Sequence, residues 1–261
     1  RYRDWLKQGH GEVDLKHSIA RSCDVYYYTL AHDLGVERLH ETLAMIGFGS
    51  ITGVDIPGEA AGLLPSPEWK RRTRKLPWYP GETVIAGIGQ GFMLATPLQM
   101  AYVTSIIANR GEVSIPHFVA QIEDPIDNSS VSLAIYHRPH IKLTSETHWD
   151  NVIDGMIEVV NGPTGTARHS GNGAVVRFAG KTGTSQVFGI AQDQEVDNDE
   201  LPEHLKNHAL FIAYAPLDVP EIAIAVIVEN GGSGSRTAAP IVRRLIDHYF
   251  KTTEHVTPFD G

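Results

Sequence analysis

The run Ala179-Gly180-Lys181-Thr182-Gly183-Thr184-Ser185 is the most informative part of this 261-residue chain. The residues just before it are β-favouring or small, so Lys181 is expected to lie on a strand. Gly183 leaves no side chain over that strand, so the backbone of a ligand can approach closely. Thr182 and Thr184 place hydroxyls around the gap, which suits a carboxylate or a peptide carbonyl. Taken alone, the motif also fits an ordinary strand end or a turn, because short motifs match by accident.

Composition excludes several classes of protein. The hydrophobic content of 42% is ordinary for a globular protein of one large domain or two small ones. The formal net charge of -9 argues against nucleic-acid binding, which needs a basic surface. No apolar run approaches the length of a bilayer span. The single cysteine, Cys23, excludes an internal disulfide.

Helical periodicity dominates the first part of the chain. Residues 14–34 carry apolar side chains at helical spacing, with a break at Ser22-Cys23-Asp24. This pattern predicts that one helix ends there and another begins, with Ser22 or Asp24 as its N-cap. Gly35 is expected to stop the second helix, and residues 36–46 to form a further short one.

Proline and glycine are frequent over residues 50–85, which are therefore predicted to form an irregular loop region. The basic run 70–75 within it is interpreted as a solvated turn rather than a specific contact with an anion. The glycine string 87–91 lacks the Gly-Lys-Ser/Thr ending of a phosphate loop, and a tight turn against a helix is expected instead. A Thr-Pro pair predicts a helix over residues 96–109.

The rest of the chain is predicted to mix strands and helices. The expected elements are a hairpin over 112–123 and 131–143, a helix over 146–160, strands over 208–214 and 221–229, and a helix over 239–250. Both strands are continuous apolar runs, which is typical of strands covered on both faces. The acidic insert 190–206 is predicted to be a mobile surface loop.

Three motifs occur in the order found in class B penicillin-binding proteins: Ser22-Cys23-Asp24, Gly89-Gln90-Gly91 followed by a helix to Ala101, and Lys181-Thr182-Gly183-Thr184. The chain resembles this family over nearly its whole length. The Ser-x-Asp form of the first of these motifs, together with the opening segment 2–11 and Pro77-Trp78-Tyr79, points to the penicillin-binding protein 2 branch of cell elongation. The combination is far more specific than any one motif.

The resemblance implies an α+β fold of the penicillin-binding protein/serine β-lactamase-like transpeptidase type, with a five-stranded antiparallel sheet flanked by helices and a helical subdomain. Two strands of that fold precede the serine motif, so three are expected here and one sheet edge is left unpaired. Residues 1–170 would form mainly the helical subdomain and active-site loops. Residues 171–261 would supply the Lys-Thr-Gly strand, two further strands and the C-terminal helix. The N-terminal part of the domain is expected to be missing.

The resemblance also implies a peptidoglycan D,D-transpeptidase. Such an enzyme crosslinks stem peptides ending in D-Ala-D-Ala through a serine acyl-enzyme and is a target of β-lactams. Ser22 and Lys181 would handle protons, and the Thr184 N–H would form half of an oxyanion hole. Substrate-binding residues would be Asp24, Thr182, Gly183 and Ser185, with the hydroxyls of Thr182 and Thr184 on the terminal carboxylate.

The sequence departs from the family pattern at the first signature, Ser-x-x-Lys. No serine has a lysine three positions later, and the nearest approach, Ser66 to Lys70, has the wrong spacing. The nucleophile and its lysine are therefore expected upstream of Arg1. The chain opens without an initiator Met and is interpreted as a piece of a longer protein that should not acylate on its own.

Asp4, His10 and Cys23 offer a carboxylate, an imidazole and a thiolate, all good zinc ligands, while a tetrahedral site needs four. Their spacing equally fits a surface Asp, a solvated His and a small buried Cys. The resemblance implies that the three hold a structural zinc ion near the active site, with a second Asp upstream. No cofactor is expected for catalysis.

Rival interpretations remain open. A serine β-lactamase or D,D-carboxypeptidase would share the fold and send the acyl group to water, and a non-catalytic peptidoglycan- or partner-binding module would keep only the cleft. A zinc hydrolase is weaker, because the three zinc-type ligands offer no evident general base. The resemblance implies the periplasmic face of the inner membrane, an N-terminal anchor, a SEDS-type membrane glycosyltransferase as partner, and no nucleic acid.

Overall fold

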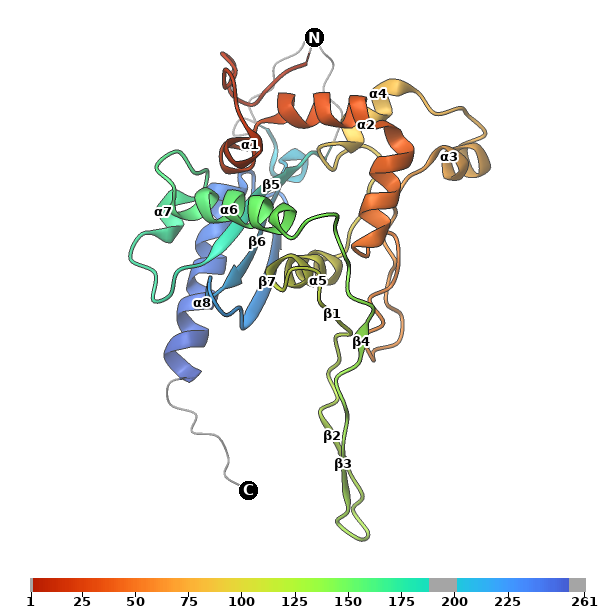
Figure 1. Cartoon of the computed structure of the whole chain (residues 1–261), viewed down its shortest axis with the longest axis vertical. Helices are drawn as coiled ribbons and strands as arrows, with labels where there is room; N and C mark the ends of the chain where they lie inside the picture. Colours follow the sequence, from red (N-terminus) through yellow and green to blue (C-terminus); the bar gives the residue numbers. More distant parts are fainter. Residues whose placement is uncertain (1, 188–200, 254–261) are drawn as a thin grey trace.

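A three-stranded antiparallel sheet lies at the centre of the computed structural model, which describes residues 2–187 and 201–253 (Figure 1). Its strands are β5 (Ala179–Ser185), β6 (His208–Ala215) and β7 (Ile222–Val228), in the order β5-β6-β7. The strand containing the Lys-Thr-Gly motif is therefore an edge strand. The sequence prediction of three strands is confirmed.

Helices cover both faces of this sheet. The helices α5 (Pro97–Ala108) and α6 (Thr147–Asn161) lie on one face, and α8 (Ala239–Thr253) lies on the other (Figure 1). A short π-helical turn, η2 (Gly234–Ala238), leads into α8. All three helices agree with the sequence prediction to within a few residues, the normal uncertainty of helix ends.

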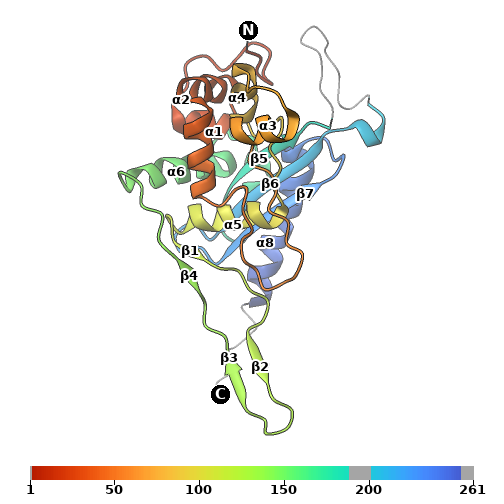
Figure 2. The same ribbon diagram turned by 90° about the vertical axis from the view of Figure 1, so that its right-hand side faces the viewer.

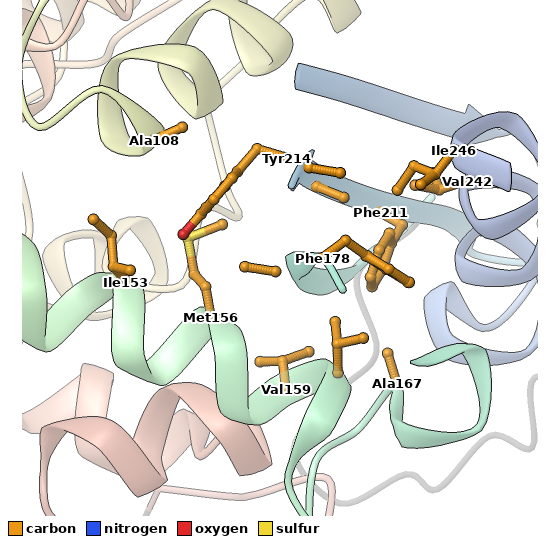
Figure 3. Packing of buried hydrophobic residues seen from close by; sticks show 14 of the residues in the cluster. Ala108, Ile153, Met156, Val159, Ala167, Phe178, Phe211, Tyr214, Val242 and Ile246 are labelled. Atoms are coloured by element: carbon orange, nitrogen blue, oxygen red, sulfur yellow. The ribbon is translucent and has the colours of Figure 1, made fainter. Parts of the chain in front are cut away.

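The core forms where aromatic side chains of β6 point to opposite faces of the sheet. Tyr214 extends toward Met156 of α6, while Phe211 lies beside Val242 and Ile246 of α8 (Figure 3). Tyr214 is 1% exposed and Phe211 is fully buried. Burial of an apolar side chain of this size contributes about 1.5–3 kcal/mol. One continuous core therefore links the helices on both faces to the strand next to β5.

Four more helices gather at one end of the sheet (Figure 2). They are α1 (Leu15–Arg21), α2 (Asp24–Met45), α3 (Pro67–Arg74) and α4 (Pro80–Ala86). The single turn α7 (Arg168–Gly171) lies beside α6 instead (Figure 1). The predicted break at Gly35 is present inside α2, where its φ of 77° and ψ of 163° are not helical. The predicted tight turn at 87–91 is also confirmed, because a Cβ on Gly87 would lie 2.3 Å from Cβ of Ala31 in α2.

The prediction of an irregular region over residues 50–85 was wrong, since α3 and α4 lie within it. Each helix has proline in its first turn, where the missing N–H has no helical partner to lose. The basic run 70–75 lies mostly on α3 and not in a turn, and its residues 71–75 are exposed, as the solvated interpretation expected, whereas Lys70 is not. Lys70 is 2% exposed, and its ammonium bonds Glu82 of α4 at 2.5 Å.

A hairpin projects from the opposite end of the molecule (Figure 1). It is built from β1 (Val113–Ser114), β2 (Gln121–Glu123), β3 (Ser130–Ser132) and β4 (His137–Arg138), with β1 pairing β4 and β2 pairing β3. This confirms the expected hairpin. The acidic insert predicted over 190–206 lies largely outside the described residues, and its end forms the turn η1 (Glu203–Leu205). Of the helices in the described ranges, none has both the length and the apolar character needed to cross a bilayer.

Candidate active site

The junction between α1 and α2 places Ser22 at one wall of the site. Ser22 ends α1 in the left-handed conformation, with φ 54° and ψ 55°, and its N–H bonds the carbonyl of Ile19. The N-cap of α2 is Cys23, so the prediction that Ser22 or Asp24 caps this helix was wrong. A left-handed residue other than glycine costs about 1–2 kcal/mol. Such strain often collects at functional sites, where the surrounding structure maintains it.

Trp5 holds this junction in place. Its indole Nε1 donates to the carbonyls of Arg21 and Ser22 at 3.1 and 3.0 Å. Its backbone N–H also acts to lower the pKa of the nearby Asp24 carboxyl, against the stronger effect of burial. The opening segment of the chain therefore folds over the Ser-Cys-Asp turn and fixes its path.

Lys181 of β5 meets Ser22 across the site. Its ammonium Nζ donates to Ser22 Oγ at 2.9 Å and to the carbonyl of Thr182 at 2.9 Å. The two residues are 159 positions apart in the sequence. The structure thus brings together the two residues on which the sequence-based interpretation depends.

Burial tunes the charges of this site. It lowers the pKa of Lys181 to about 8, although the nearby carboxylate of Asp24 acts in the opposite direction. Burial and the charge of Asp4 raise the pKa of Asp24 to about 6. A lysine with a pKa near 8 can exist as a neutral amine at mildly alkaline pH, so it can both accept and donate protons.

The other predicted residues of β5 line its edge. Thr182 is half-buried, and its Oγ1 lies 2.9 Å from Oγ1 of Thr166, which follows α6. Thr184 is exposed, and Gly183 and Ser185 are half-buried. The carbonyl of Thr184 accepts a hydrogen bond of 2.8 Å from Gln90 Nε2. The motif therefore presents hydroxyl and backbone groups together along one open edge of the sheet.

Asp4, His10 and Cys23 also come together, directly beside Ser22. One ligand atom from each lies within 4.8 Å of the others, and His10 Nδ1 is 3.1 Å from Asp4 Oδ2. The side chains of Asp4 and His10 are each 1% exposed and Cys23 is 4% exposed. The alternative of a surface Asp and a solvated His is therefore wrong. Burial raises the pKa of the Cys23 thiol, so a thiolate there needs a positive partner.

Sequence reasoning missed three residues of this region: Trp5, Gln90 and Thr166. Gln90 stood inside the glycine string, which was predicted to form a turn and matched a family motif, but no contact was predicted for its side chain. A polar side chain between two glycines was the available signal. No local pattern marks Trp5 or Thr166, because both act through contacts with residues far away in the sequence.

Comparison with known proteins decides the family. The family model described as the penicillin binding protein transpeptidase domain matches residues 1–247. The chain belongs to this family. Among curated relatives, the peptidoglycan D,D-transpeptidase MrdA of Haemophilus influenzae is 41% identical over 249 residues, which cover 95% of this chain and 38% of that protein. The chain thus spans about two fifths of the length of this relative.

Solved structures of penicillin-binding proteins share the fold described above. The structure of Pseudomonas aeruginosa PBP2 in complex with WCK 5153 matches with a TM-score of 0.81 and 45% identity, over 95% of this chain and 50% of that one. Helicobacter pylori PBP2, in a complex with MreC, matches with a TM-score of 0.83 and 32% identity, over 98% of this chain and 43% of that one. The transpeptidase fold expected from the motifs is therefore confirmed.

Proposed function

We propose that this chain is the C-terminal part of a peptidoglycan D,D-transpeptidase that acts in cell elongation and is a target of β-lactams. The observation that carries the proposal is the hydrogen bond from Lys181 to Ser22, made beside an open sheet edge in a chain of this family. The likeness to MrdA supports the D,D-transpeptidase activity over other acyl transfers.

The first half of the reaction forms an acyl-enzyme. A serine oxygen attacks the carbonyl carbon of the penultimate D-Ala of a stem peptide, and the bond from that carbon to the terminal D-Ala nitrogen breaks. The proton leaves the serine, and the departing nitrogen takes one up. Ser22 and Lys181 form a hydroxyl–amine relay that carries a proton to this leaving group.

The second half consumes the ester. The amine of a second stem peptide attacks the same carbonyl carbon, the bond to the serine oxygen breaks, and the serine regains its proton. In both halves negative charge develops on the carbonyl oxygen. The backbone N–H of Thr184 on the open edge of β5 is assigned as one donor to that oxyanion.

The nucleophile is assigned to a part of the protein outside these 261 residues. The sequence contains no Ser-x-x-Lys, and the chain covers 38% of its Haemophilus relative. On this assignment the chain alone does not acylate, whereas the whole protein does. Substrate contacts are assigned to Asp24, Thr182, Gly183 and Ser185, with the hydroxyls of Thr182 and Thr184 on the terminal carboxylate.

A structural zinc ion is assigned to Asp4, His10 and Cys23. Their donor atoms are buried and close enough to share one ion, and their chemistry suits zinc. A tetrahedral site needs one more ligand, which is assigned to the upstream part of the protein. The metal would anchor the Ser22 turn through Cys23, next to Trp5, whose ring centre lies 5.5 Å from that of His10. No cofactor takes part in the chemistry itself.

The setting follows from the substrate. Peptidoglycan crosslinks form outside the cytoplasmic membrane, so the domain is placed on the periplasmic face of the inner membrane, on an N-terminal anchor. A SEDS-type membrane glycosyltransferase is the proposed partner. The complex of Helicobacter pylori PBP2 with MreC shows that a similar protein assembles with another protein.

Labelled penicillin tests the proposal on the whole protein and on this chain. The whole protein should form a covalent adduct that persists for hours, and the chain alone should form none. Release of the label within seconds would instead indicate a β-lactamase or a carboxypeptidase. No adduct in the whole protein would indicate a non-catalytic binding module and contradict the proposal.

A further inference from the structure

The outer edge of β5 carries backbone groups that pair with no other strand in the described ranges. Its strand partner is β6 on the inner side, in register from Ala179 opposite Tyr214 to Ser185 opposite His208. An open edge of this kind can add an extended peptide as a further strand. Thr184 and Gln186 at the end of this edge are exposed.

The side-chain amide of Gln90 makes hydrogen bonds to two of these backbone groups. Its Nε2 donates to the carbonyl of Thr184 at 2.8 Å, and its Oε1 accepts from the N–H of Gln186 at 3.4 Å. A glutamine amide carries the same donor and acceptor as a peptide group. The side chain therefore bonds the edge as one residue of an added strand would.

Glycines on both sides of Gln90 form a hinge. Gly89 has a φ of 74° and Gly91 a φ of 78°, in the region that glycine enters without strain. A Cβ built on Gly89 meets no described atom within 4 Å, whereas one on Gly91 would lie 3.2 Å from Cγ2 of Ile85, so the free space is on the Gly89 side of the turn. Gly87, in contrast, lies tightly against Ala31 and fixes the base of the turn. Gln90 can therefore leave the edge while α4 stays in place.

We propose that Gln90 is a specificity-determining residue that closes the edge of β5 until the amide N–H of a ligand replaces it on the carbonyl of Thr184. The inference rests on the proposed function, because the ligands that carry this amide N–H are a stem peptide and a penicillin with an acylamide side chain. A ligand with such an N–H regains the hydrogen bond that it displaces. A ligand without one gains nothing at this carbonyl.

The consequence is a selective change when Gln90 is shortened. In Gln90→Ala the carbonyl of Thr184 is already free, so a ligand N–H gains a hydrogen bond without displacing another. One hydrogen bond gained in this way should raise the acylation rate constant about three- to ten-fold over that of wild type. Ligands that lack the N–H should show no such gain.

The experiment uses the whole protein and two β-lactams that share one ring system. Benzylpenicillin carries an acylamide N–H, whereas penicillanic acid has no side chain at that carbon. Second-order acylation rate constants are measured for wild type, Gln90→Ala and Gln90→Asn, whose amide is one methylene too short to reach. Gln121→Ala is the matched control, because Gln121 is exposed on the distant hairpin and its side-chain amide bonds Glu123 next to it on the same strand.

The inference expects both Gln90 variants to react with benzylpenicillin about three to ten times faster and with penicillanic acid at an unchanged rate. Gln121→Ala should match wild type with both compounds. An unchanged or slower reaction of the Gln90 variants with benzylpenicillin, at unchanged melting temperature, overturns the inference. An equal acceleration with both compounds also overturns it. Failure of wild type to react with either compound overturns the proposed function itself, and this inference with it.

Discussion

The ammonium of Lys181 donates a hydrogen bond of 2.9 Å to the hydroxyl of Ser22. A strand from the last third of the chain and a helix junction from its start meet at this bond. Burial lowers the pKa of Lys181 to about 8, so the pair combines a tunable amine with a hydroxyl that can pass a proton on. A pair of this kind suits proton transfer near a nucleophile, which the proposed acyl transfer needs.

Ser22 should be more easily replaced by glycine than by alanine. Both changes remove the hydroxyl, but only glycine adopts φ 54° without strain, so Ser22→Gly should be about 1 kcal/mol more stable than Ser22→Ala. In the whole protein, both variants should lose penicillin acylation to a similar extent. Urea unfolding and acylation rates of the two proteins check this, and equal stabilities would show that the turn carries no such strain.

The pair of Lys70 and Glu82 should stabilise the contact between α3 and α4. Lys70 is buried and its Nζ also lies 4.3 Å from the centre of the Tyr79 ring. Lys70→Met leaves Glu82 without its ion partner and should cost about 3 kcal/mol of unfolding free energy.

The double variant Lys70→Met with Glu82→Gln provides the control for this pair. It removes the unpaired charge while keeping an oxygen that can accept from the N–H of Tyr79, as Glu82 does. It should therefore be more stable than Lys70→Met alone. If the losses of unfolding free energy in Lys70→Met and in Glu82→Gln sum to the loss in the double variant, the two side chains are not coupled.

Glu59 should give the protein acid-sensitive stability. Its carboxylate accepts from the N–H and the hydroxyl of Thr52, both at 2.7 Å, and from the N–H of Gly53 at 3.0 Å. Burial alone would raise the pKa of Glu59, but these hydrogen bonds outweigh it and hold the pKa below 4.5. The stabilisation is therefore present above pH 4.5 and is lost as the pH falls through the lower folded pKa.

Glu59→Gln tests this effect by unfolding measurements at two pH values. At pH 7 the variant should be less stable by about 1–3 kcal/mol, because hydrogen bonds to a charged group are lost. Below the folded pKa of Glu59, the unfolding free energies of the variant and the wild type should become similar. A difference that stays constant down to acid pH would contradict the role given to the ionised carboxylate.

His10 and His17 form a natural pair for testing the metal site. Each ring Nδ1 faces an Asp oxygen, at 3.1 Å for His10 and 2.7 Å for His17, but only His10 is buried beside Cys23. In the whole protein, His10→Ala should lose bound zinc and His17→Ala should keep it, as measured by elemental analysis. Cys23→Ala should also lose zinc and loosen the Ser22 turn. A wild-type protein free of zinc after metal-replete purification would contradict the assignment.

Much of the fold follows from sequence patterns that depend on neighbouring residues. The continuous apolar runs correctly predicted β6 and β7, the Thr-Pro pair predicted the start of α5, and Gly35 predicted the break in α2. The Ser22 and Lys181 motifs could be matched from the resemblance even though the residues are far apart in the chain. Each of these signals is local or is carried by a specific combination of residues.

The failures have a different physical cause. Pro67 and Pro80 occur in helix first turns, where proline is as suitable as in a loop, so composition alone could not separate the two. Lys70 looked solvated because burial of a lysine depends on a distant Glu82. Trp5 and Gln90 reach their partners only after the chain has folded, so the sequence around them does not show which residues they contact.

A double-mutant cycle shows whether Ser22 and Lys181 act together in acylation. The second-order rate constant for acylation of the whole protein by benzylpenicillin is measured in wild type, Ser22→Ala, Lys181→Ala and the double variant. If the two residues pass one proton, each single change should slow acylation by about 10²- to 10⁴-fold, and the second change should add little to the first. Single variants that acylate at the wild-type rate, or losses that multiply in full, would contradict the account.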